Sequence, residues 1–268
     1  YRYPGIKYLN FFIIIMYRHR IIPCLLLKNG GLVKTYKFKN PKYVGDPINA
    51  IRIFNDKEVD ELMVVDIMAS KNNREPNYHL IEQFASECFM PLCYGGGITK
   101  VEEAHRLFSL GVEKICLQTA AIENPSLITE ISSRFGCQSV LVSVDVKKNW
   151  LGRKRLYSAS RGKILPTKLL DFIKLAVESG AGEIVLNTVD HDGVMDGMDI
   201  DLIKEVSEAI SVPIIAVGGV GKLDDIKLAI DAGANAVAAG AFFVFQGPHR
   251  AVLITYPKNN ELENLFKN

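Results

Sequence analysis

The sequence lacks any hydrophobic run long enough to cross a lipid bilayer. The apolar run near its amino terminus, Leu9–Met16, has eight residues, whereas a spanning helix needs about 20. Tyr-Arg-His-Arg follows this run in place of a cleavage site of small residues, so a secretory signal is not indicated. We therefore expect residues 1–15 to be an upstream or tag-like segment, Met16 to be the native start, and the protein to be cytoplasmic. A peripheral membrane anchor is the alternative for this segment.

Neither sign of charge is in excess. The 32 Lys and Arg residues against 30 Asp and Glu give a net charge of +2, which is too balanced for a nucleic-acid binder that works through bulk charge. Five cysteines form no CxxC pair and leave one over, which favours reduced thiols over a disulfide framework. The balanced charge thus predicts no nucleic-acid partner, and the absence of a bilayer-length apolar run predicts no membrane partner.

Several motifs of catalysis and cofactor binding are also missing. The five histidines are scattered, with no two at metal-ligand spacing and no Cys/His cluster. There is no GxSxG nucleophile elbow, and the glycine pairs lack the GxGxxG spacing of a dinucleotide site. We therefore expect no metal and no cofactor.

What the sequence does contain is a regular alternation of apolar strand-like runs and amphipathic helix-like runs. Strands that are buried on both faces have this nearly continuous apolar character. Eight such units in about 250 residues predict a (β/α)8 TIM barrel, with an open doubly wound sheet as the alternative. No Pro/Ser-rich linker divides the chain, so we expect residues 16–268 to form one domain. The predicted strands are Arg20–Leu27, Glu61–Ile67, Pro91–Tyr94, Lys114–Gln118, Ser139–Val146, Glu183–Val189, Pro213–Val217 and Ala236–Gly240.

An internal repeat supports the barrel. The segment that begins at Met90 aligns without a gap with the segment that begins at Val212, an offset of 122 residues. Pro91 matches Pro213, and the glycine pair at 96–97 matches the pair at 218–219. An offset of half the barrel predicts a fold built from two similar half-barrels.

Glycine-rich segments follow the third and seventh predicted strands. Active sites of such barrels lie at the carboxyl ends of the strands, and glycine there lets backbone N–H groups approach an anion closely. One cradle in each half predicts a substrate with two phosphates at opposite ends. The predicted phosphate-binding residues are Gly96, Gly97, Gln118, Thr119, Asp192, Gly193, Gly218, Gly219, Ala239 and Gly240.

Asp145 closes the apolar fifth strand, where an ionisable group is costly unless it faces the barrel mouth. We therefore interpret it as a catalytic acid or base, with a hydrogen bond that orients a loop as the alternative. Asp66 ends the second strand and is a candidate for catalysis or for a structural role. Lys34, seven residues past the first strand, is a candidate for contact with a phosphate or carbonyl. The corresponding end of the first strand, Pro23–Lys28, has no carboxylate.

Together these segments resemble the HisF family, the cyclase subunits of imidazole glycerol phosphate synthase. The likeness covers residues 20–245 and is carried by long matched segments. They are RIIPCLLLKNGGLVKTYKFKN, VGDPINA, DELMVVDIMAS, PLCYGGGI, VEKICLQTAAIENP, AGEIVL and DHDGVMDGMDIDLI.

The resemblance implies a mechanism and a partner. A HisH-type glutaminase releases ammonia, which crosses the barrel and attacks a bisphosphorylated ribulosyl substrate (PRFAR) at the far end, giving imidazole glycerol phosphate and AICAR. It assigns acid/base work to Asp145 and a substrate contact to Lys34. The family's ammonia gate falls on four charged residues at strand starts; a salt-bridge layer that only stabilises the barrel is the alternative for them. These are Arg20, Glu61, Lys114 and Glu183.

The departures from the family are specific. Leu26 stands in place of a catalytic aspartate, Gln118 in place of asparagine, and Val217 and Gly240 in place of serines. Together with the tail FVFQGPHRAVLITYP they resemble the HisF paralogue of acetamidino sugar modification for surface polysaccharide. Three hypotheses follow: a subunit of that pathway, the cyclase of histidine biosynthesis, or a non-catalytic ammonia conduit for a separate synthetase.

Overall fold

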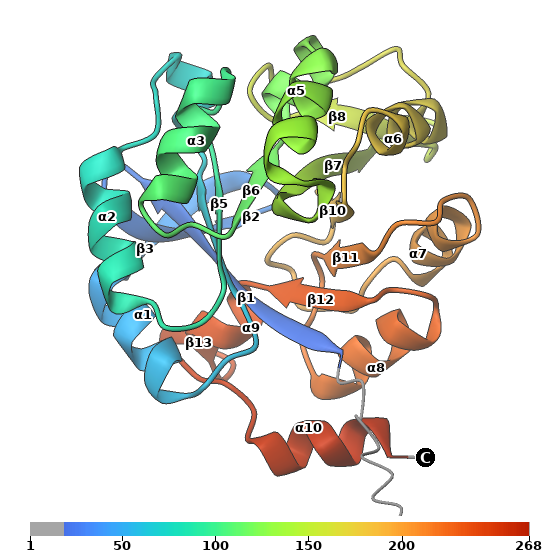
Figure 1. Cartoon of the computed structure of the whole chain (residues 1–268). Helices are drawn as coiled ribbons and strands as arrows, with labels where there is room; N and C mark the ends of the chain where they lie inside the picture. Colours follow the sequence, from blue (N-terminus) through green and yellow to red (C-terminus); the bar gives the residue numbers. More distant parts are fainter. Residues whose placement is uncertain (1–18, 268) are drawn as a thin grey trace, which may run out of the picture.

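The computed structural model describes residues 19–267, and eight parallel strands form its centre (Figure 1). Each strand pairs with the next, and the last pairs with the first, so the ring is closed. The predicted barrel is confirmed, whereas the expectation for residues 1–15 lies outside the described residues. The strands are β1 (Arg20–Lys28), β4 (Leu62–Asp66), β5 (Leu92–Gly95), β6 (Lys114–Leu117), β7 (Val140–Lys148), β10 (Glu183–Thr188), β11 (Ile214–Val217) and β12 (Ala236–Ala239).

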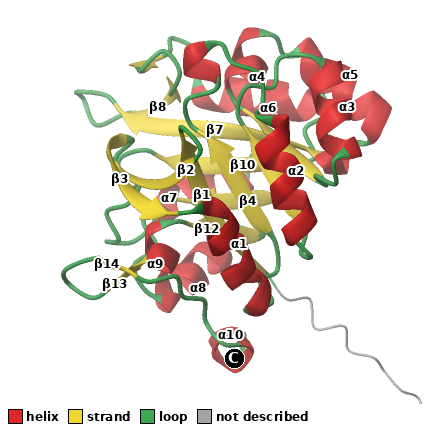
Figure 2. Ribbon diagram, turned by 90° about the vertical axis from the view of Figure 1, so that its left-hand side faces the viewer, coloured by secondary structure: helices red, strands yellow, loops and turns green. Residues whose placement is uncertain are grey.

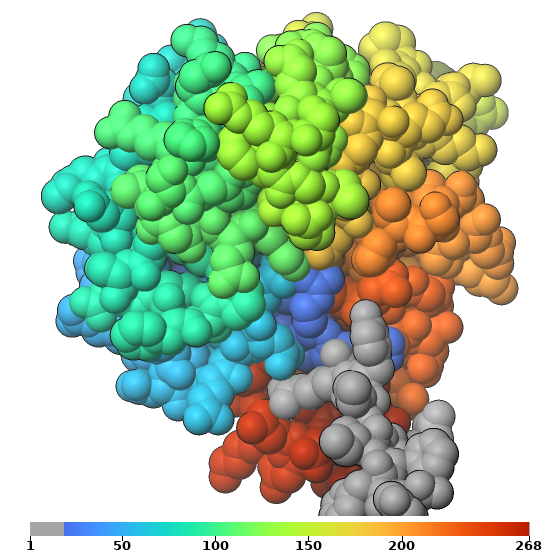
Figure 3. All heavy atoms as spheres, viewed as in Figure 1, coloured from blue at the N-terminus to red at the C-terminus, as the bar shows by residue number. Residues whose placement is uncertain are grey.

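Helices fill the links between these strands and surround the ring. Side chains at several helix starts accept backbone N–H groups, as Asp46 does from Asn49 and Asp199 from Leu202. In the space-filling view the first and last segments adjoin, as the closed ring requires (Figure 3). The helices are α1 (Pro47–Asp56), α2 (Tyr78–Glu87), α3 (Val101–Ser109), α4 (Thr119–Glu123), α5 (Ser126–Phe135), α6 (Leu169–Glu178), α7 (Ile200–Ser207), α8 (Leu223–Asp231), α9 (Ala241–Val244) and α10 (Asn259–Phe266), with 3-10 turns at η1 (Ser70–Asn72) and η2 (Cys137–Ser139).

Two apolar cores follow from the alternation of side chains along the strands. The larger lies between the strands and the helices. The smaller fills the inside of the ring with residues of mixed size, which include Ile22, Met63, Cys93, Leu141 and Ile215. Small residues on β12, Ala236 and Ala238, also belong to it. The barrel interior is therefore apolar along most of its length.

The two half-barrels repeat their backbone hydrogen bonds at the offset of the sequence repeat. Leu62 N donates to Pro91 O, and Ile184 N donates to Pro213 O, both at 2.9 Å. Glu103 and Asp225 likewise accept the backbone N–H groups that precede α3 and α8. The duplicated polar contacts show that the repeat is present in the structure as well as in the sequence.

Three hairpins extend the barrel beyond the predicted elements. β2 (Gly31–Tyr36) and β3 (Lys39–Gly45) follow β1, while β8 (Lys154–Ser158) and β9 (Lys163–Ile164) continue from β7. A third, smaller pair, β13 (Phe245–Gln246) and β14 (Ala251–Val252), lies in the tail. Figure 2 shows β3, β8 and the β13–β14 hairpin along one edge of the molecule, the left of the view. These hairpins surround the mouth of the barrel.

Candidate functional site

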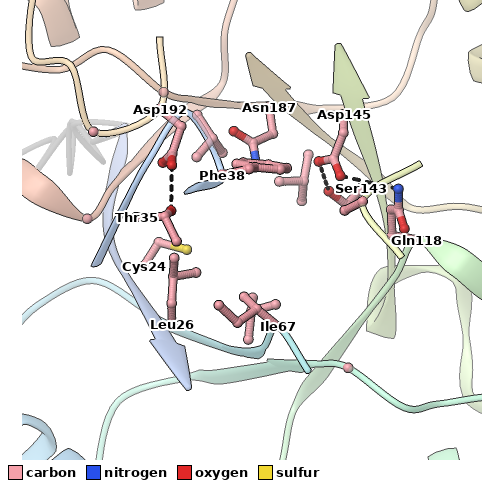
Figure 4. Close-up of a pocket in the computed structure, with 18 of the residues that line it drawn as sticks. Cys24, Leu26, Thr35, Phe38, Ile67, Gln118, Ser143, Asp145, Asn187 and Asp192 are labelled. Carbon is pink, nitrogen blue, oxygen red and sulfur yellow. Dashed lines mark hydrogen bonds between the residues drawn. The ribbon is translucent and has the colours of Figure 1, made fainter. Parts of the chain in front are cut away.

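A cavity of about 440 Å³ opens at the carboxyl ends of the barrel strands (Figure 4). Its upper wall is polar, whereas its floor is made by apolar residues of the barrel interior. Among the residues that line it are Cys24, Leu26, Lys34, Asp66, Gly96, Gln118, Thr119, Asp145, Asn187, Asp192, Gly218, Gly219 and Gly240. Most residues that the sequence nominated therefore surround one space.

Asp145 projects from β7 into this cavity and is 4% exposed. Gln118 Nε2 donates to its Oδ2 at 3.2 Å, and Ser143 Oγ donates to its Oδ1 at 3.4 Å. Burial raises the pKa of Asp145 to about 7, although the hydrogen bonds from Ser143 and Asn187 favour the ionised form. A carboxyl group that titrates near neutrality can both take up and release a proton at working pH.

Lys34 lies opposite, on β2, and is also buried. Its Nζ donates to Asp192 Oδ1 at 2.6 Å, and the hydroxyl of the adjacent Thr35 donates to Asp192 Oδ2 at 2.7 Å. Backbone N–H of Lys37 donates to Asp192 O, so the loop after β10 is tied to the β2–β3 hairpin. Asp192, nominated for phosphate binding, is thus the ion-pair partner of Lys34.

Leu26 and Asp66 line the wall between Asp145 and Lys34. The side chain of Leu26 lines the cavity from β1, and its backbone neighbours are Val33 on β2 and Val65 on β4. Asp66 is near, but its Oδ1 accepts the backbone N–H groups of Met68 and Ala69. These two hydrogen bonds hold the turn after β4, which is a structural role for Asp66.

The first glycine cradle is only partly open to the cavity. Gly96 lines it, and a side chain there would collide with the Asp66 backbone. The N–H of Gly97 donates to Ser70 Oγ at 3.2 Å, so that donor already has a partner. Gln118 and Thr119 lie at the start of α4, where the Thr119 hydroxyl donates to Gln118 Oε1.

The second cradle lies across the cavity. Gly218, Gly219, Ala239 and Gly240 line it together with Gly193. Gly219 has a φ of +108°, and a Cβ there would collide with the Gly197 carbonyl oxygen. A side chain at Gly219 would therefore distort the backbone, so its substitution cannot isolate a phosphate contact. Gly240 leaves more room, since the Cys24 carbonyl oxygen would lie 3.0 Å from an added Cβ.

A closed ring of four charges lies at the opposite end of the barrel. Arg20 donates to Glu61 at 2.5 Å and to Glu183 at 2.6 Å, while Lys114 donates to the same two carboxylates at 2.8 and 2.9 Å. Burial opposes the charged form of Arg20, but the two carboxylates outweigh it and raise its pKa. Glu61 Oε1 is buried without a hydrogen-bond partner. The ring spans the strand starts, where the sequence placed its candidate gate.

Between the ring and the cavity lies the apolar interior with three thiols. Cys93 and Cys116 are buried among its aliphatic residues, and Cys24 packs against them near the cavity. Burial raises the pKa of Cys24 to about 12 and raises that of the other two thiols as well. The thiols are therefore neutral at physiological pH and leave the barrel interior uncharged.

Two residues of the site were not found by sequence reasoning. Asn187, on β10, has an Oδ1 that is buried without a hydrogen-bond partner, and Ser143 lies beside Asp145. Each is a polar residue within an otherwise apolar strand, and this was the sequence signal that could have identified it. Among residues 19–267 no group of three His, Cys, Asp or Glu side chains is placed to hold a metal ion. Nor does any helix of that range have the length and apolarity to cross a membrane.

Comparison with known proteins identifies a matching family model and several relatives of this chain. The family model described as "Histidine biosynthesis protein" matches residues 20–248. A Pseudomonas aeruginosa protein provisionally named imidazole glycerol phosphate synthase subunit hisF2 is 53% identical over 249 residues, 92% of this chain and 99% of that protein. A provisionally named HisF subunit of Leptospira borgpetersenii is 51% identical over 253 residues, 94% of this chain and 100% of that protein. The imidazole glycerol phosphate synthase subunit HisF of Streptomyces avermitilis is 40% identical over 226 residues, 84% of this chain and 90% of that protein. The chain therefore belongs to the HisF family of histidine biosynthesis proteins.

Proposed function

We propose that this barrel is the ammonia-accepting subunit of a glutamine-dependent synthase. A HisH-type glutaminase docks on the face that carries the ion-pair ring, and ammonia enters there. The ammonia crosses the interior and reacts with a phosphorylated substrate in the mouth cavity. The observation that carries this proposal is the placement of the ring and of Asp145 at opposite ends of one apolar barrel.

In this proposal the site residues have distinct roles. Asp145 moves a proton to or from the substrate, because its pKa of about 7 suits both directions. Lys34 contacts an anionic or carbonyl oxygen after exchanging its bond to Asp192. The glycine-rich strand ends around Gly96 and Gly218 offer close backbone approach to phosphate.

The substrate assignment rests on Leu26. A cavity with one acid–base carboxylate favours the paralogue that serves acetamidino sugar modification over the cyclase of histidine biosynthesis. Loss of a positioned general acid or base lowers a rate by about 10²–10⁴. The provisional naming of the relatives at about 50% identity is compatible with either pathway.

The docking step is tested by co-purification with a HisH-type glutaminase. Glutamine hydrolysis should rise in the complex, and Phe89→Ser should weaken it, since Phe89 is 85% exposed in the loop before β5 on the ring face. Trp150→Ser, on the mouth side, is the matched control and should leave binding unchanged. A well-folded barrel that never binds such a glutaminase contradicts the proposal.

The substrate assignment is tested with ammonium and the bisphosphorylated ribulosyl substrate. Wild-type turnover should be about 10²–10⁴ below that of a HisF with both aspartates. Leu26→Asp should raise this turnover. Leu26→Asn should not, because asparagine has the shape of aspartate but no acidic group. Rapid wild-type cyclisation would assign the protein to histidine biosynthesis instead.

A second candidate function is a conduit that passes ammonia to a separate synthetase. Leu26 favours it, because an aliphatic side chain at this position permits the passage of ammonia but supplies no acid or base. Asp145→Asn discriminates the two functions. It should abolish product formation if the reaction occurs in this barrel and leave delivery of ammonia intact if it does not.

A further inference from the structure

The balanced net charge conceals a strong segregation along the chain. Residues 28–45 and 146–170 contain 13 Lys and Arg and no Asp or Glu. All 30 carboxylates belong to the rest of the chain, with the remaining 19 cations. The two ranges form the β2–β3 hairpin and the β8–β9 extension of β7, so both border the mouth (Figure 2). We call these two ranges the basic rim.

Most charges of the basic rim are not neutralised by neighbours. Three of the 13 cations have carboxylate partners: Lys34 with Asp192, Lys154 with Asp199, and Arg161 with Glu123. For the other ten, no ion pair with a carboxylate of residues 19–267 is present. They are Lys28, Lys37, Lys39, Lys42, Lys147, Lys148, Arg153, Arg155, Lys163 and Lys168.

Apolar side chains protrude from the basic rim and from the tail hairpin beside it. Trp150 and Leu151, at the turn between β7 and β8, are 89% and 53% exposed. Tyr43 on β3 is 65% exposed, and Leu253 beside β14 is 53% exposed. Trp150 and Leu151 are adjacent on one projecting turn and are flanked by unpaired cations, an arrangement that suits an interface between water and an apolar phase.

We propose that the basic rim docks the barrel mouth onto an anionic lipid surface, with Trp150 entering the interfacial layer. Tryptophan and tyrosine favour the membrane–water interface, and lysines near an anionic leaflet add attraction with each charge. Fluid lipid accepts separate tips without shape complementarity.

Two features favour lipid over other anionic partners. Lysines outnumber arginines in the rim by ten to three, whereas protein interfaces are enriched in arginine and depleted in lysine. Single-stranded nucleic acids stack on aromatic platforms within a groove, whereas the tip residue beside Trp150 is aliphatic. The sequence predicted no membrane partner because it has no bilayer-length apolar run, a criterion that does not address attachment to a lipid surface.

Trp150 is the single tryptophan of the chain, so intrinsic fluorescence reports directly from the tip. Vesicles of phosphatidylcholine with phosphatidylglycerol should shift its emission to the blue at low salt, and brominated lipid should quench it. Pure phosphatidylcholine vesicles should produce little change, and added salt should reverse the shift. An unchanged spectrum with the anionic vesicles would overturn the proposal.

Vesicle sedimentation with variants locates the contact. Lys39→Gln with Lys148→Gln should lower partitioning about 30-fold, at about tenfold per 1.4 kcal/mol and about 1 kcal/mol per cation. Trp150→Ser should lower it as well. Lys174→Gln with Lys204→Gln, on α6 and α7, and Phe89→Ser are matched controls that should bind as wild type does. Equal binding by rim variants and wild type, or tighter binding to a single-stranded oligonucleotide than to vesicles, contradicts lipid docking.

Discussion

At the residue scale, the buried carboxyl of Asp145 sets the character of the cavity. The side chain ends an apolar strand and has few hydrogen-bond donors around it, so the folded protein disfavours its charge. The same burial that makes it an acid–base group near neutrality reduces stability whenever the group is ionised. The proposed acid–base function of Asp145 therefore conflicts with stability.

Asp145→Asn should stabilise the protein at alkaline pH. The folded carboxyl binds its proton more tightly than the unfolded one. Its stabilising contribution is therefore complete below about pH 4 and is lost as pH rises through about 7. The variant should gain about 2–4 kcal/mol over wild type at pH 8, given a rise of about three pKa units. Urea denaturation at pH 5 and 8 measures the difference, and an equal gain at both values would contradict it.

The sequence identified the central residues of the cavity but did not show which of them pair. Asp145, Lys34 and Asp192 were nominated separately, and each lies at the cavity. The bond between Lys34 and Asp192 spans 158 residues, and no local pattern encodes such a contact. Asn187 escaped notice because a single polar residue in a strand resembles an ordinary solvent-facing position.

At the element scale, the tail hairpin holds the loop that carries Asp192. Arg250, between β13 and β14, donates to the carbonyls of Gly193 and Val194 at 3.0 and 2.9 Å. It does so with a left-handed backbone, φ 49°, which is uncommon for a residue with a side chain. The tail hairpin thus fixes one wall of the cavity.

Arg250→Ala should loosen the loop after β10 without unfolding the barrel. Two carbonyls lose their donor, and Asp192 loses part of the frame that aligns it with Lys34. Hydrogen exchange at the Val194 and Asp192 amides should accelerate, while amides of β10 itself should remain protected. Arg153→Ala, in the exposed turn between β7 and β8, is a suitable control and should change neither.

The charge ring should stabilise the protein more than an exposed ion pair does. Glu61→Ala should destabilise the protein by about 2–4 kcal/mol, because Arg20 and Lys114 would then share one carboxylate in a partly buried site. Glu87→Ala, which removes the exposed partner of Arg52, should have little effect. Thermal or urea denaturation compares the two, and equal small effects would mean that the ring does not stabilise the barrel.

The elements that the sequence predicted well are those buried on both faces. All eight barrel strands were found within two residues at nearly every end, because continuous apolar runs mark them. The β2–β3 hairpin was not predicted. Its β3 strand, Lys39–Gly45, is largely exposed and has no alternating pattern, so its pairing depends on β1 and β2 beside it.

At the scale of the whole molecule, the tail closes the seam between the first and last strands. Tyr256 donates its hydroxyl to the Ile21 carbonyl oxygen of β1 at 2.9 Å, and its ring packs against Phe243 of α9. The chain segment after β12 therefore returns to the strand with which the ring began. The seam is fastened by side-chain contacts as well as by the strand pairing itself.

Tyr256→Phe should lower the free energy of unfolding by about 1–2 kcal/mol, because a buried carbonyl loses a donor. The loss should appear in the single main transition, since the seam belongs to the ring. Tyr43→Phe, whose side chain is exposed, is the matched control. If Tyr256→Phe is as stable as wild type in urea, the tail does not fasten the seam.

Closure of the ring also has a consequence for synthesis on the ribosome. Arg20 pairs with Ala236, 216 residues later, so β1 emerges roughly 10–40 s before its partner exists. During that time β4 and β2 cover only its second half, and residues 20–23 form an open edge that other nascent chains are able to join. Pro23 within this edge has no N–H to offer, which limits such pairing. The protein should consequently depend on chaperones throughout this interval, until the eighth strand has been made.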